Sequence, residues 1–477
     1  MKRCPFVLLT LAAVLAVTSA NAESTRPRAR EAGIVIGTLS PGPHNAITDV
    51  DGVGVGHATL AQGTRLNTGV TAIVPHAGNL YRQRVPAAIE VGNGYGKLAG
   101  ITQVRELGEL ETPILLTGTL STWKVADATV DWLLRQPGME NVRSINPVVG
   151  ETNDGYLSDI RARPLTQALV EQALTQLSFT DVAEGTVGAG AGTVAFGWKG
   201  GIGTSSRRLA EGDGGYTVGV LVQSNFGGEL TIAGVPMGTI LPDPAEAARS
   251  LTPPPSTGDG SIMMVVATDA PLDAAQLQRL ARRALVGLAR TGSVMSNGSG
   301  DYVIAFSTAK ENLRDPDQDV QPARSVAGEA MSPLFQAAAE ATEEAILNSL
   351  FRATSVRGHR GNAAALPLEP VLDALRRAGA VKTEAQADAD AFARIMARHE
   401  IPGAQLVVTR NGLSEAYAYG VQSRATGKPV TQRTVFEAAS LSKVIGAYIA
   451  LRLVDQGQLD LDTPLWNYWL SPRTQDN

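Results

Sequence analysis

The sequence predicts an α/β protein with one large domain and a smaller C-terminal unit. The chain has 477 residues, more than a single hydrophobic core usually takes. Short apolar runs alternate along it with stretches that show helical spacing. With 44% apolar and 18% charged residues, the composition is that of a globular protein rather than of a disordered or membrane protein. The formal net charge of −5 offers no general attraction to nucleic acid or to anionic lipid.

The first 22 residues have the pattern of a secretion signal. Two basic residues precede the apolar run 6–17, and Ala20-Asn21-Ala22 offers the small residues that a signal peptidase reads. We therefore expect cleavage after Ala22 and a periplasmic or secreted location; the alternative is a buried N-terminal helix. The only cysteine, Cys4, lies inside this segment, so neither a disulfide nor a lipid anchor is indicated. No later apolar run approaches the length of a membrane span.

Glycine-rich strands and turns are expected in the first half of the large domain. Strands are expected at 33–37, 45–60, 68–75 and 113–117, and a helix at about 118–134. The alternate glycines at 52–56 do not have the spacing of a dinucleotide-binding loop. The glycine-rich stretches 185–193 and 199–206 lack the Gly-Lys-Ser/Thr ending of a phosphate loop. The sequence therefore does not indicate nucleotide binding.

Polar residues stand beside two of the later expected elements. The loop 146–157, which precedes a helix expected at 164–177, contains Glu, Asn, Asp and Tyr. These residue types are common at functional sites, but they are equally common in ordinary turns. A strand expected at 216–222 leads to Asn225, whose amide could donate to a developing oxyanion. An Asn that only closes a turn fits the local sequence equally well.

The junction at Ser261 has the features of a self-processing nucleophile. The Pro- and Gly-rich stretch 252–260 cannot join a helix or a ladder, and it runs directly into the apolar strand 262–268. Gly260 lets the backbone adopt the conformation in which the Ser261 hydroxyl could attack the carbonyl of the preceding peptide. After such a cut, Ser261 would carry a free α-amine with a pKa of about 8, which could act as the base for its own hydroxyl. The alternative is a surface linker that enters an ordinary strand.

A strand, helix and strand unit is expected after this junction. A helix is expected at 271–290 and a second strand at 302–306, preceded by the polar turn 297–301. This unit could bring Ser299 and Asp301 beside the head of the first strand. Further helices at 332–352 and 368–378 would end the large domain at about residue 380, and the stretch 381–389, rich in Ala, Asp and Gln, is expected to be a linker.

The remainder, 390–477, changes character. A helix is expected at 390–399, strands at 404–410 and 415–421, and a helix that opens at 436–443 and runs to 453. Ser440 and Lys443 are three residues apart on one helix face, which lets the ammonium approach the hydroxyl. A Ser and a Lys at this spacing occur often by chance, so the pair has meaning only in its context.

Five stretches of the large domain together resemble the family of the L-aminopeptidase D-amidase/D-esterases and the β-peptidyl aminopeptidases. They are Thr48–His57, Gly150–Tyr156, Lys199–Arg207, Gly260–Ile262 and Gly298–Asp301. The resemblance covers residues 32–378. It implies a four-layer αββα sandwich of the self-processing aminopeptidase type, made as one chain and cut between Gly260 and Ser261 into two subunits that stay together.

The same resemblance implies the roles of the site residues. Ser261 would be the nucleophile, with its α-amine as the base, and Asn225 the oxyanion-hole residue. Tyr156 would bind the substrate's amine or polarise the reacting carbonyl. Ser299 and Asp301 match a pair that orients the groups around the nucleophile and places a negative charge near it. Some relatives have Glu at the position of Asp301. No metal or cofactor is required, and a homo-oligomer of αβ pairs is implied.

The C-terminal segment resembles the beginning of a serine β-lactamase or a penicillin-binding-type esterase. The matching stretches are Ile401–Ala404, Phe436–Lys443 and Gly457–Leu465. Ser440 would be the nucleophile and Lys443 its activator. The family's Tyr-x-Asn and Lys-Thr-Gly elements do not occur before residue 477, so we expect a partial α+β segment that is inactive by itself.

The main functional hypothesis is an exported serine aminopeptidase that acts through an acyl-enzyme on Ser261. Its substrates would be short peptides, amides or esters of L-α, D-α or β-amino acids, and neither nucleic acid nor a membrane span is expected. A β-lactamase-type acyl hydrolase that uses Ser440 and Lys443 is the alternative. A non-catalytic envelope protein with a decayed site is a third hypothesis. A related acyltransferase that passes an acetyl group between ornithine and glutamate derivatives fits poorly with export.

Overall fold

The computed structural model describes residues 26–250, 260–381, 384–410, 413–464 and 467–468. These residues divide into a large unit that ends at Thr383 and a C-terminal unit that begins at Glu384. The expected secretion signal at 1–22 and the loop residues 252–259 lie outside the described residues. Among the described helices, none is long and apolar enough to cross a membrane.

Two six-stranded sheets form the large unit. The first has the strand order β4-β7-β6-β2-β1-β8 and the second the order β11-β12-β15-β16-β3-β5. The first sheet consists of β1 (Gly54–Gln62), β2 (Leu66–Val74), β4 (Leu98–Ala99), β6 (Ile114–Gly118), β7 (Val148–Thr152) and β8 (Leu177–Ser178). The second sheet consists of β3 (Val85–Gly94), β5 (Glu109–Leu110), β11 (Gly201–Arg208), β12 (Thr217–Asn225), β15 (Ser261–Thr268) and β16 (Gly300–Ser307).

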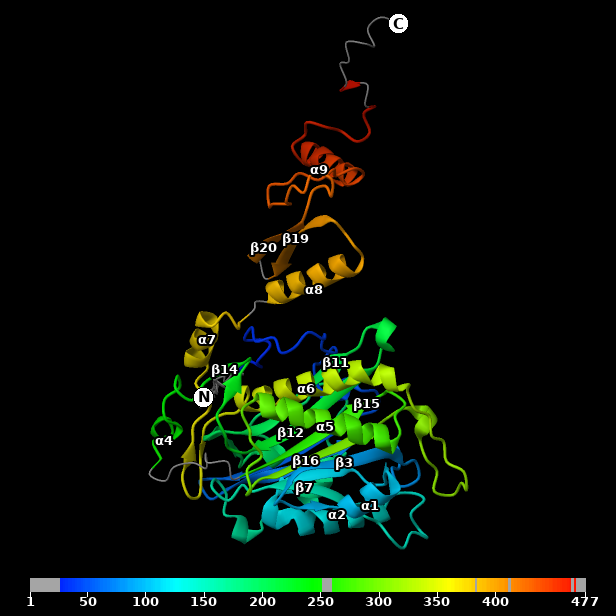
Figure 1. Cartoon of the computed structure of the whole chain (residues 1–477), viewed down its shortest axis with the longest axis vertical. Coiled ribbons are helices and arrows are strands. Elements are labelled where there is room, and N and C mark those ends of the chain that lie inside the picture. Colours follow the sequence, from blue (N-terminus) through cyan, green and yellow to red (C-terminus); the bar gives the residue numbers. More distant parts are fainter. Residues whose placement is uncertain (1–25, 251–259, 382–383, 411–412, 465–466, 469–477) are drawn as a thin grey trace, which may run out of the picture. The chain divides into compact units, whose positions relative to one another are not determined.

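Helices lie on the outer faces of the two sheets (Figure 1). The helices α5 (Ala274–Arg290) and α6 (Met331–Phe351) pack on the second sheet. The helices α2 (Thr122–Leu134) and α3 (Gln167–Thr175) pack on the first. The large unit also contains the helices α1 (Ile101–Leu107), α4 (Pro244–Ala247) and α7 (Leu368–Arg377).

The strand β15 contributes to two hydrophobic cores because its side chains alternate between the two faces of the sheet. Met263 and Val265 belong to the core between the sheets, whereas Ile262 and Met264 belong to the core under α5 and α6. A strand buried on both faces requires a continuous apolar run, and the sequence provides one directly after Ser261. This burial fixes the position of Ser261 at the head of a central strand.

A buried ionic cluster attaches the N-terminal segment to α6. The fully buried guanidinium of Arg207 lies 2.7 Å from Glu344, which also forms an ion pair of 2.7 Å with Arg30. Burial alone would raise the pKa of Glu344, but the two guanidinium groups lower it to about 2. The stretch Lys199–Arg207, which helped to indicate the family, thus contains a residue that stabilises the fold.

Most expected elements of the large unit are present with shifted ends, but the strand expected at 33–37 is not formed and the strand expected at 45–60 begins only at Gly54. The helix expected from residue 271 begins at Ala274, because the Asp273 side chain accepts a hydrogen bond of 2.8 Å from the Gln276 N–H group and caps it. The strand expected to end at 222 continues to Asn225. Within the stretch 381–389, which was expected as an irregular linker, helix α8 (Glu384–Arg398) begins at Glu384, where the C-terminal unit also begins. The alanines of this stretch favour a helix strongly enough to explain the difference.

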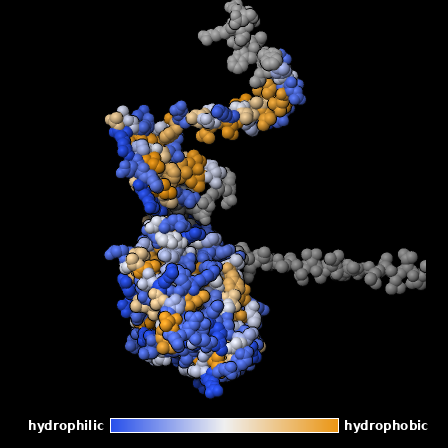
Figure 2. Space-filling view, turned by 90° about the vertical axis from the view of Figure 1, so that its right-hand side faces the viewer, coloured by the Kyte–Doolittle hydropathy of each residue, from blue (hydrophilic) through white to orange (hydrophobic). Residues whose placement is uncertain are grey.

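The C-terminal unit contains α8, the antiparallel strands β19 (Gly403–Arg410) and β20 (Leu413–Gly420), and helix α9 (Leu441–Asp455). The rings of Phe392 on α8 and Tyr419 on β20 are 5.7 Å apart. The apolar side chains of α9 are exposed, and this end of the chain shows large hydrophobic patches (Figure 2). The exposed set includes Leu441, Val444, Ile445, Tyr448 and Ile449.

Candidate active site

Ser261 opens β15 in the middle of the second sheet. It pairs with Asn225 on the antiparallel strand β12 and with Gly300 on the parallel strand β16, and it is 6% exposed. A Cβ atom at Gly300 would lie 3.0 Å from the Ser261 hydroxyl oxygen, so a side chain there would crowd it. The pairing therefore brings Asn225 beside Ser261, and the absence of a side chain at Gly300 lets the Gly96 backbone approach closely, since a Cβ there would lie 2.6 Å from the Gly96 Cα.

The backbone around Gly260 leaves no room for a side chain. A Cβ atom at this position would lie 2.2 Å from the carbonyl oxygen of Asn225. The carbonyl oxygen of Gly260 accepts a hydrogen bond of 3.0 Å from the Gly300 N–H group. This donor polarises the carbonyl of the peptide that precedes Ser261, and it lies where negative charge would develop if that carbonyl were attacked.

The side-chain amide of Asn225 has a fixed orientation. Its oxygen accepts a hydrogen bond of 2.9 Å from the Val194 N–H group, so its Nδ2 group remains as the donor. Asn225 is 7% exposed and lines the same hollow as Ser261. The arrangement suits the stabilisation of an oxyanion near the Ser261 hydroxyl.

Lys199 supports the loop that orients Asn225. Its fully buried ammonium donates hydrogen bonds of 2.8 Å to the carbonyl oxygens of Gly190 and Gly200, which flank Val194 along the chain. Burial lowers the pKa of this lysine to about 7. In the sequence, Lys199 was noted only as the first residue of the stretch Lys199–Arg207, which resembles the family. Its two hydrogen bonds to carbonyl oxygens show that a donor side chain at this position holds the loop.

The hollow over Ser261 has a volume of about 700 Å³, which is typical of small-ligand sites. Its lining includes residues from both sheets, because β7 of the first sheet packs against β15 of the second. The packing is close, since a Cβ atom at Gly150 on β7 would contact the Met263 side chain on β15. The residues that matter most for chemistry are Ser261, Gly260, Asn225, Tyr156, Glu151 and Arg360.

Tyr156 lines this hollow and is held by residues far along the chain. Its hydroxyl lies 3.0 Å from the Ser250 hydroxyl and donates a hydrogen bond of 3.2 Å to the carbonyl oxygen of Asn362. A Cβ at Gly361 would lie 2.1 Å from the tyrosine hydroxyl oxygen. The hairpin of β17 (Val356–Arg357) and β18 (Asn362–Ala363) therefore fixes the position of the ring.

Ser299 and Asp301 form a separate pair at the head of β16. The Ser299 hydroxyl donates a hydrogen bond of 2.7 Å to Asp301, and both residues are buried. Asp301 is on the same face of the strand as Val303 and Ala305, which pack in the core under α5, whereas Ser261 is on the face between the sheets. Neither residue belongs to the lining of the hollow. Their role around the nucleophile stays a prediction.

The buried carboxyl of Asp301 gives a pH-dependent stability. Burial raises the pKa of Asp301 to about 6, against a smaller lowering by the Ser299 hydroxyl. Since this pKa lies above the ordinary value of 3.8, the free energy of unfolding should fall as the pH rises from about 4 to about 6. Asp301→Asn keeps an acceptor for Ser299, so it should raise the free energy of unfolding at pH 8 by about 1–3 kcal/mol and change it little at pH 4. Urea denaturation at both pH values measures this, and an equal change at both would contradict it.

Glu151 is the residue of the hollow to which the sequence assigned no role. It lies near the end of β7, is 2% exposed, and its Oε1 atom accepts a hydrogen bond of 2.8 Å from the Lys97 N–H group. The Lys97 ammonium is 3.5 Å from the same oxygen. Residues 148–152 were expected to form part of a loop, but they form the strand β7. The sequence therefore did not indicate that this carboxylate lines the same hollow as Ser261.

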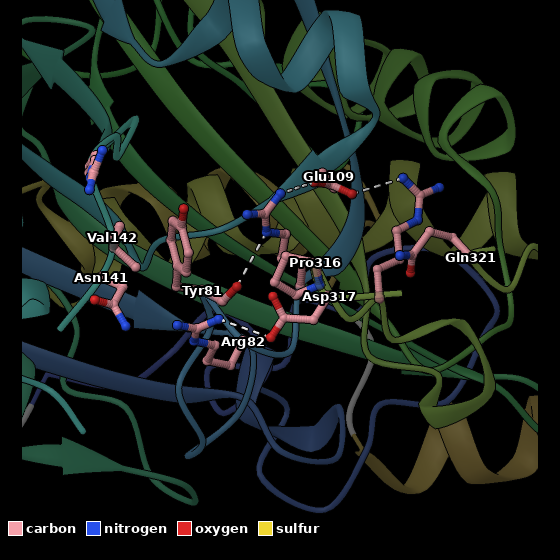
Figure 3. A pocket seen from close by; sticks show the side chains of 11 residues that line it. Tyr81, Arg82, Glu109, Asn141, Val142, Pro316, Asp317 and Gln321 are labelled. Atoms are coloured by element: carbon pink, nitrogen blue, oxygen red, sulfur yellow. Dashed lines mark hydrogen bonds and ion pairs between the residues drawn. The ribbon is translucent and has the colours of Figure 1, made fainter. Parts of the chain in front are cut away.

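A second hollow, of about 730 Å³, has four arginines among its eleven lining residues (Figure 3). Glu109 lies between two of them, 2.6 Å from Arg84 and 3.2 Å from Arg314. The Arg84 guanidinium also lies 4.8 Å from the centroid of the Tyr81 ring. The described residues that line this hollow include no Ser, Thr or Cys, so it lacks the hydroxyl or thiol nucleophile of a serine-type acyl transfer.

The two C-terminal candidates lie at the start of α9. Ser440 is the residue before the helix, and the Lys443 N–H group donates a hydrogen bond of 3.1 Å to its carbonyl oxygen. Both side chains are exposed. An exposed pair is surrounded by water and lacks the enclosed environment that strengthens electrostatic catalysis.

Possible metal ligands do not cluster in the described part of the chain. No group of three or more His, Cys, Asp or Glu side chains is placed there to hold a metal ion.

A serine at a strand head, with an amide donor beside it in a hollow of this size, is the arrangement of a serine-type peptidase.

The chain belongs to peptidase family S58, whose model matches residues 45–364, and it is an aminopeptidase of that family. It is 40% identical to the beta-peptidyl aminopeptidase BapA of Sphingosinicella microcystinivorans, over 78% of this chain and 98% of the relative. This finding confirms the resemblance inferred from the five stretches.

Solved structures agree with this family. A Burkholderia sp. beta-aminopeptidase has 42% identity and a TM-score of 0.68, over 74% of this chain and 99% of that chain. The L-aminopeptidase D-Ala-esterase/amidase of Ochrobactrum anthropi, described as a variant of the Ntn hydrolase fold, has 37% identity and the same TM-score, over 75% of this chain and 100% of that one.

The C-terminal segment matches a different family. A β-lactamase model matches residues 389–476. The segment is 38% identical to a β-lactamase of Providencia stuartii, over 17% of this chain and 21% of that relative. The match therefore spans about a fifth of the length of that enzyme.

Proposed function

We propose that this chain is an exported aminopeptidase that cuts its own Gly260–Ser261 peptide bond and then releases N-terminal residues through an acyl-enzyme on Ser261. In this proposal, the two sheets and their outer helices form the four-layer αββα sandwich of the self-processing type. The observation that carries it is the position of Ser261, which lies between the carbonyl that it would attack and the fixed amide of Asn225.

Self-cleavage starts from the polarised carbonyl of Gly260. The Ser261 hydroxyl oxygen adds to this carbonyl carbon while the Gly300 N–H group stabilises the oxyanion. The C–N bond then breaks, the nitrogen takes up the proton of the hydroxyl, and an ester joins Gly260 to Ser261. Water hydrolyses this ester and leaves a carboxylate on Gly260 and a free α-amine on Ser261.

Peptide hydrolysis uses the same hydroxyl after the cut. The Ser261 α-amine accepts the hydroxyl proton as the oxygen attacks the substrate carbonyl, and the Nδ2 group of Asn225 stabilises the oxyanion. The leaving amine takes the proton, and water then hydrolyses the acyl-enzyme. The free amine of Ser261 is therefore both the product of maturation and the base of the reaction.

The carboxylate of Glu151 suits the free amine of the substrate. It is buried at the edge of the hollow and has one cationic partner, Lys97, whose own side chain is 46% exposed. A buried carboxylate can replace the water that a substrate ammonium loses on binding, because it accepts charge-assisted hydrogen bonds from that group. Glu151 is therefore assigned to the recognition of the N-terminal amine.

Glu151→Gln should raise the KM of a dipeptide with a free N-terminus about tenfold or more and change kcat less. The amide oxygen of Gln keeps the acceptor for the Lys97 N–H group, so the loop should keep its position. Steady-state kinetics on the processed variant measure both constants. A loss confined to kcat, with an unchanged KM, would contradict the assignment.

The similarity to beta-peptidyl aminopeptidases supports N-terminal β-amino acids as substrates, with L-α and D-α residues as further candidates. Short peptides fit the volume of the hollow better than folded proteins do. Export from the cytoplasm is proposed from the pattern of residues 1–22, and assembly of αβ pairs into a homo-oligomer from the family alone.

A β-lactamase-type hydrolase that uses Ser440 and Lys443 is the second candidate. The match of residues 389–476 to a β-lactamase model supports it. The exposure of both side chains favours the view that this segment contributes no hydrolysis of its own.

A further inference from the structure

The hollow over Ser261 contains two cations that differ in their surroundings. Lys97 forms an ion pair with Glu151. Arg360, which comes from near the C-terminal end of the large unit, also lines the hollow and is exposed. Within residues 26–250 and 260–381, the Arg360 guanidinium has no ion pair and no side-chain hydrogen bond. The hollow therefore offers one positive group that is available to a ligand.

The backbone of Arg360 is fixed relative to the catalytic residues. Its N–H group donates a hydrogen bond of 3.0 Å to the carbonyl oxygen of Tyr156, and the Gly358 N–H group closes the hairpin tip on the carbonyl oxygen of Gly361 at 2.9 Å. Tyr156 follows Glu151 by five residues in the same segment of the chain. The hairpin thus holds Arg360 against the segment that supplies the proposed amine-binding carboxylate.

We propose that Arg360 binds the C-terminal carboxylate of short peptide substrates, so that a peptide with a free C-terminus binds more tightly than its C-terminal amide. This inference rests on the proposed function, in which Glu151 binds the N-terminal ammonium. A guanidinium group matches a carboxylate with two parallel hydrogen bonds, and a C-terminal amide cannot form the same charged pair. An extended dipeptide is about 7 Å long, which suits a hollow of about 700 Å³ with opposite charges in its lining.

The proposal predicts a change in KM and not in kcat. The substrate carboxylate is remote from the reacting carbonyl, so its contact with Arg360 is equally strong in the ground state and the transition state. Arg360→Ala should raise the KM of a β-alanyl dipeptide about tenfold and leave the KM of its C-terminal amide unchanged. Arg360→Lys should give an intermediate KM, because Lys keeps the charge but loses the paired geometry. The difference between acid and amide should shrink at high salt.

Arg357→Ala is the matched control, because Arg357 is exposed on the same hairpin but does not line the hollow. It should change neither substrate. Steady-state kinetics of the wild type and the three variants, on the processed full-length protein, give the test. An equal change of KM for acid and amide in Arg360→Ala, or no change for either, would overturn the inference while the proposed function stands. If the wild type hydrolyses neither substrate, the proposed function fails and this inference fails with it.

Discussion

Ser261→Ala should leave the protein as one uncut chain and reduce peptide hydrolysis at least 10⁴-fold, on the order of the loss seen when an enzyme loses its nucleophile. Both effects have one cause in the proposed mechanism, in which the same hydroxyl attacks the Gly260 carbonyl during maturation and the substrate carbonyl during turnover. The fold should be unaffected, since Ala removes one oxygen from a side chain that faces the hollow. Denaturing mass spectrometry and hydrolysis of a β-alanyl dipeptide measure the two effects.

Ser440→Ala is the control for this prediction. It replaces the other candidate serine, which is exposed at the start of α9, and it should leave both self-cleavage and hydrolysis unchanged. Hydrolysis that survives in Ser261→Ala and disappears in Ser440→Ala would move the active site to the C-terminal unit.

The second large effect is expected for Asn225→Asp, which should lower kcat about 10²–10³-fold. The new carboxylate keeps an oxygen acceptor for the Val194 N–H group, so the loop stays attached. The substitution replaces the Nδ2 donor by a negatively charged oxygen. This oxygen repels the negative charge that develops on the oxyanion in the transition state. The change should therefore act on the transition state more than on substrate binding.

Asn153→Asp gives a matched comparison, because Asn153 lines the same hollow and its oxygen already accepts a hydrogen bond of 3.0 Å from the Gly155 N–H group. It introduces the same charge into the same hollow without removing the proposed oxyanion donor. Equal losses of kcat in the two variants would show that charge in the hollow, and not the Asn225 donor, determines the rate.

Local pattern indicated three strands of the second sheet, β12, β15 and β16, but not β3, β5 or β11. The apolar runs of β12, β15 and β16 are each bounded by glycine or polar residues, so local pattern is enough to indicate them. Strand pairing depends on contacts between distant parts of the chain, which local pattern does not contain. The approach of Asn225 to Ser261 could therefore be inferred only from family resemblance.

Three residues, Glu151, Asp301 and Arg360, show what the sequence did not indicate about the site. Glu151 was placed in a loop because β7 is only five residues long and its sequence ends in polar residues. Asp301 was expected beside Ser261, but the register pairs Ser261 with Gly300, so the alternation of side chains directs Asp301 to the other face. Arg360 was not singled out, because it reaches the hollow through a hairpin tip with no recognisable pattern.

The most direct test of the central claim is the intact mass of the purified wild-type protein under denaturing conditions, with N-terminal sequencing of each chain. Self-processing predicts two chains, one of which begins at Ser261 and ends with the C-terminal unit. A single chain that still contains the Gly260–Ser261 bond, in a preparation that hydrolyses peptides, would contradict both the cut and the role of the Ser261 α-amine as the base.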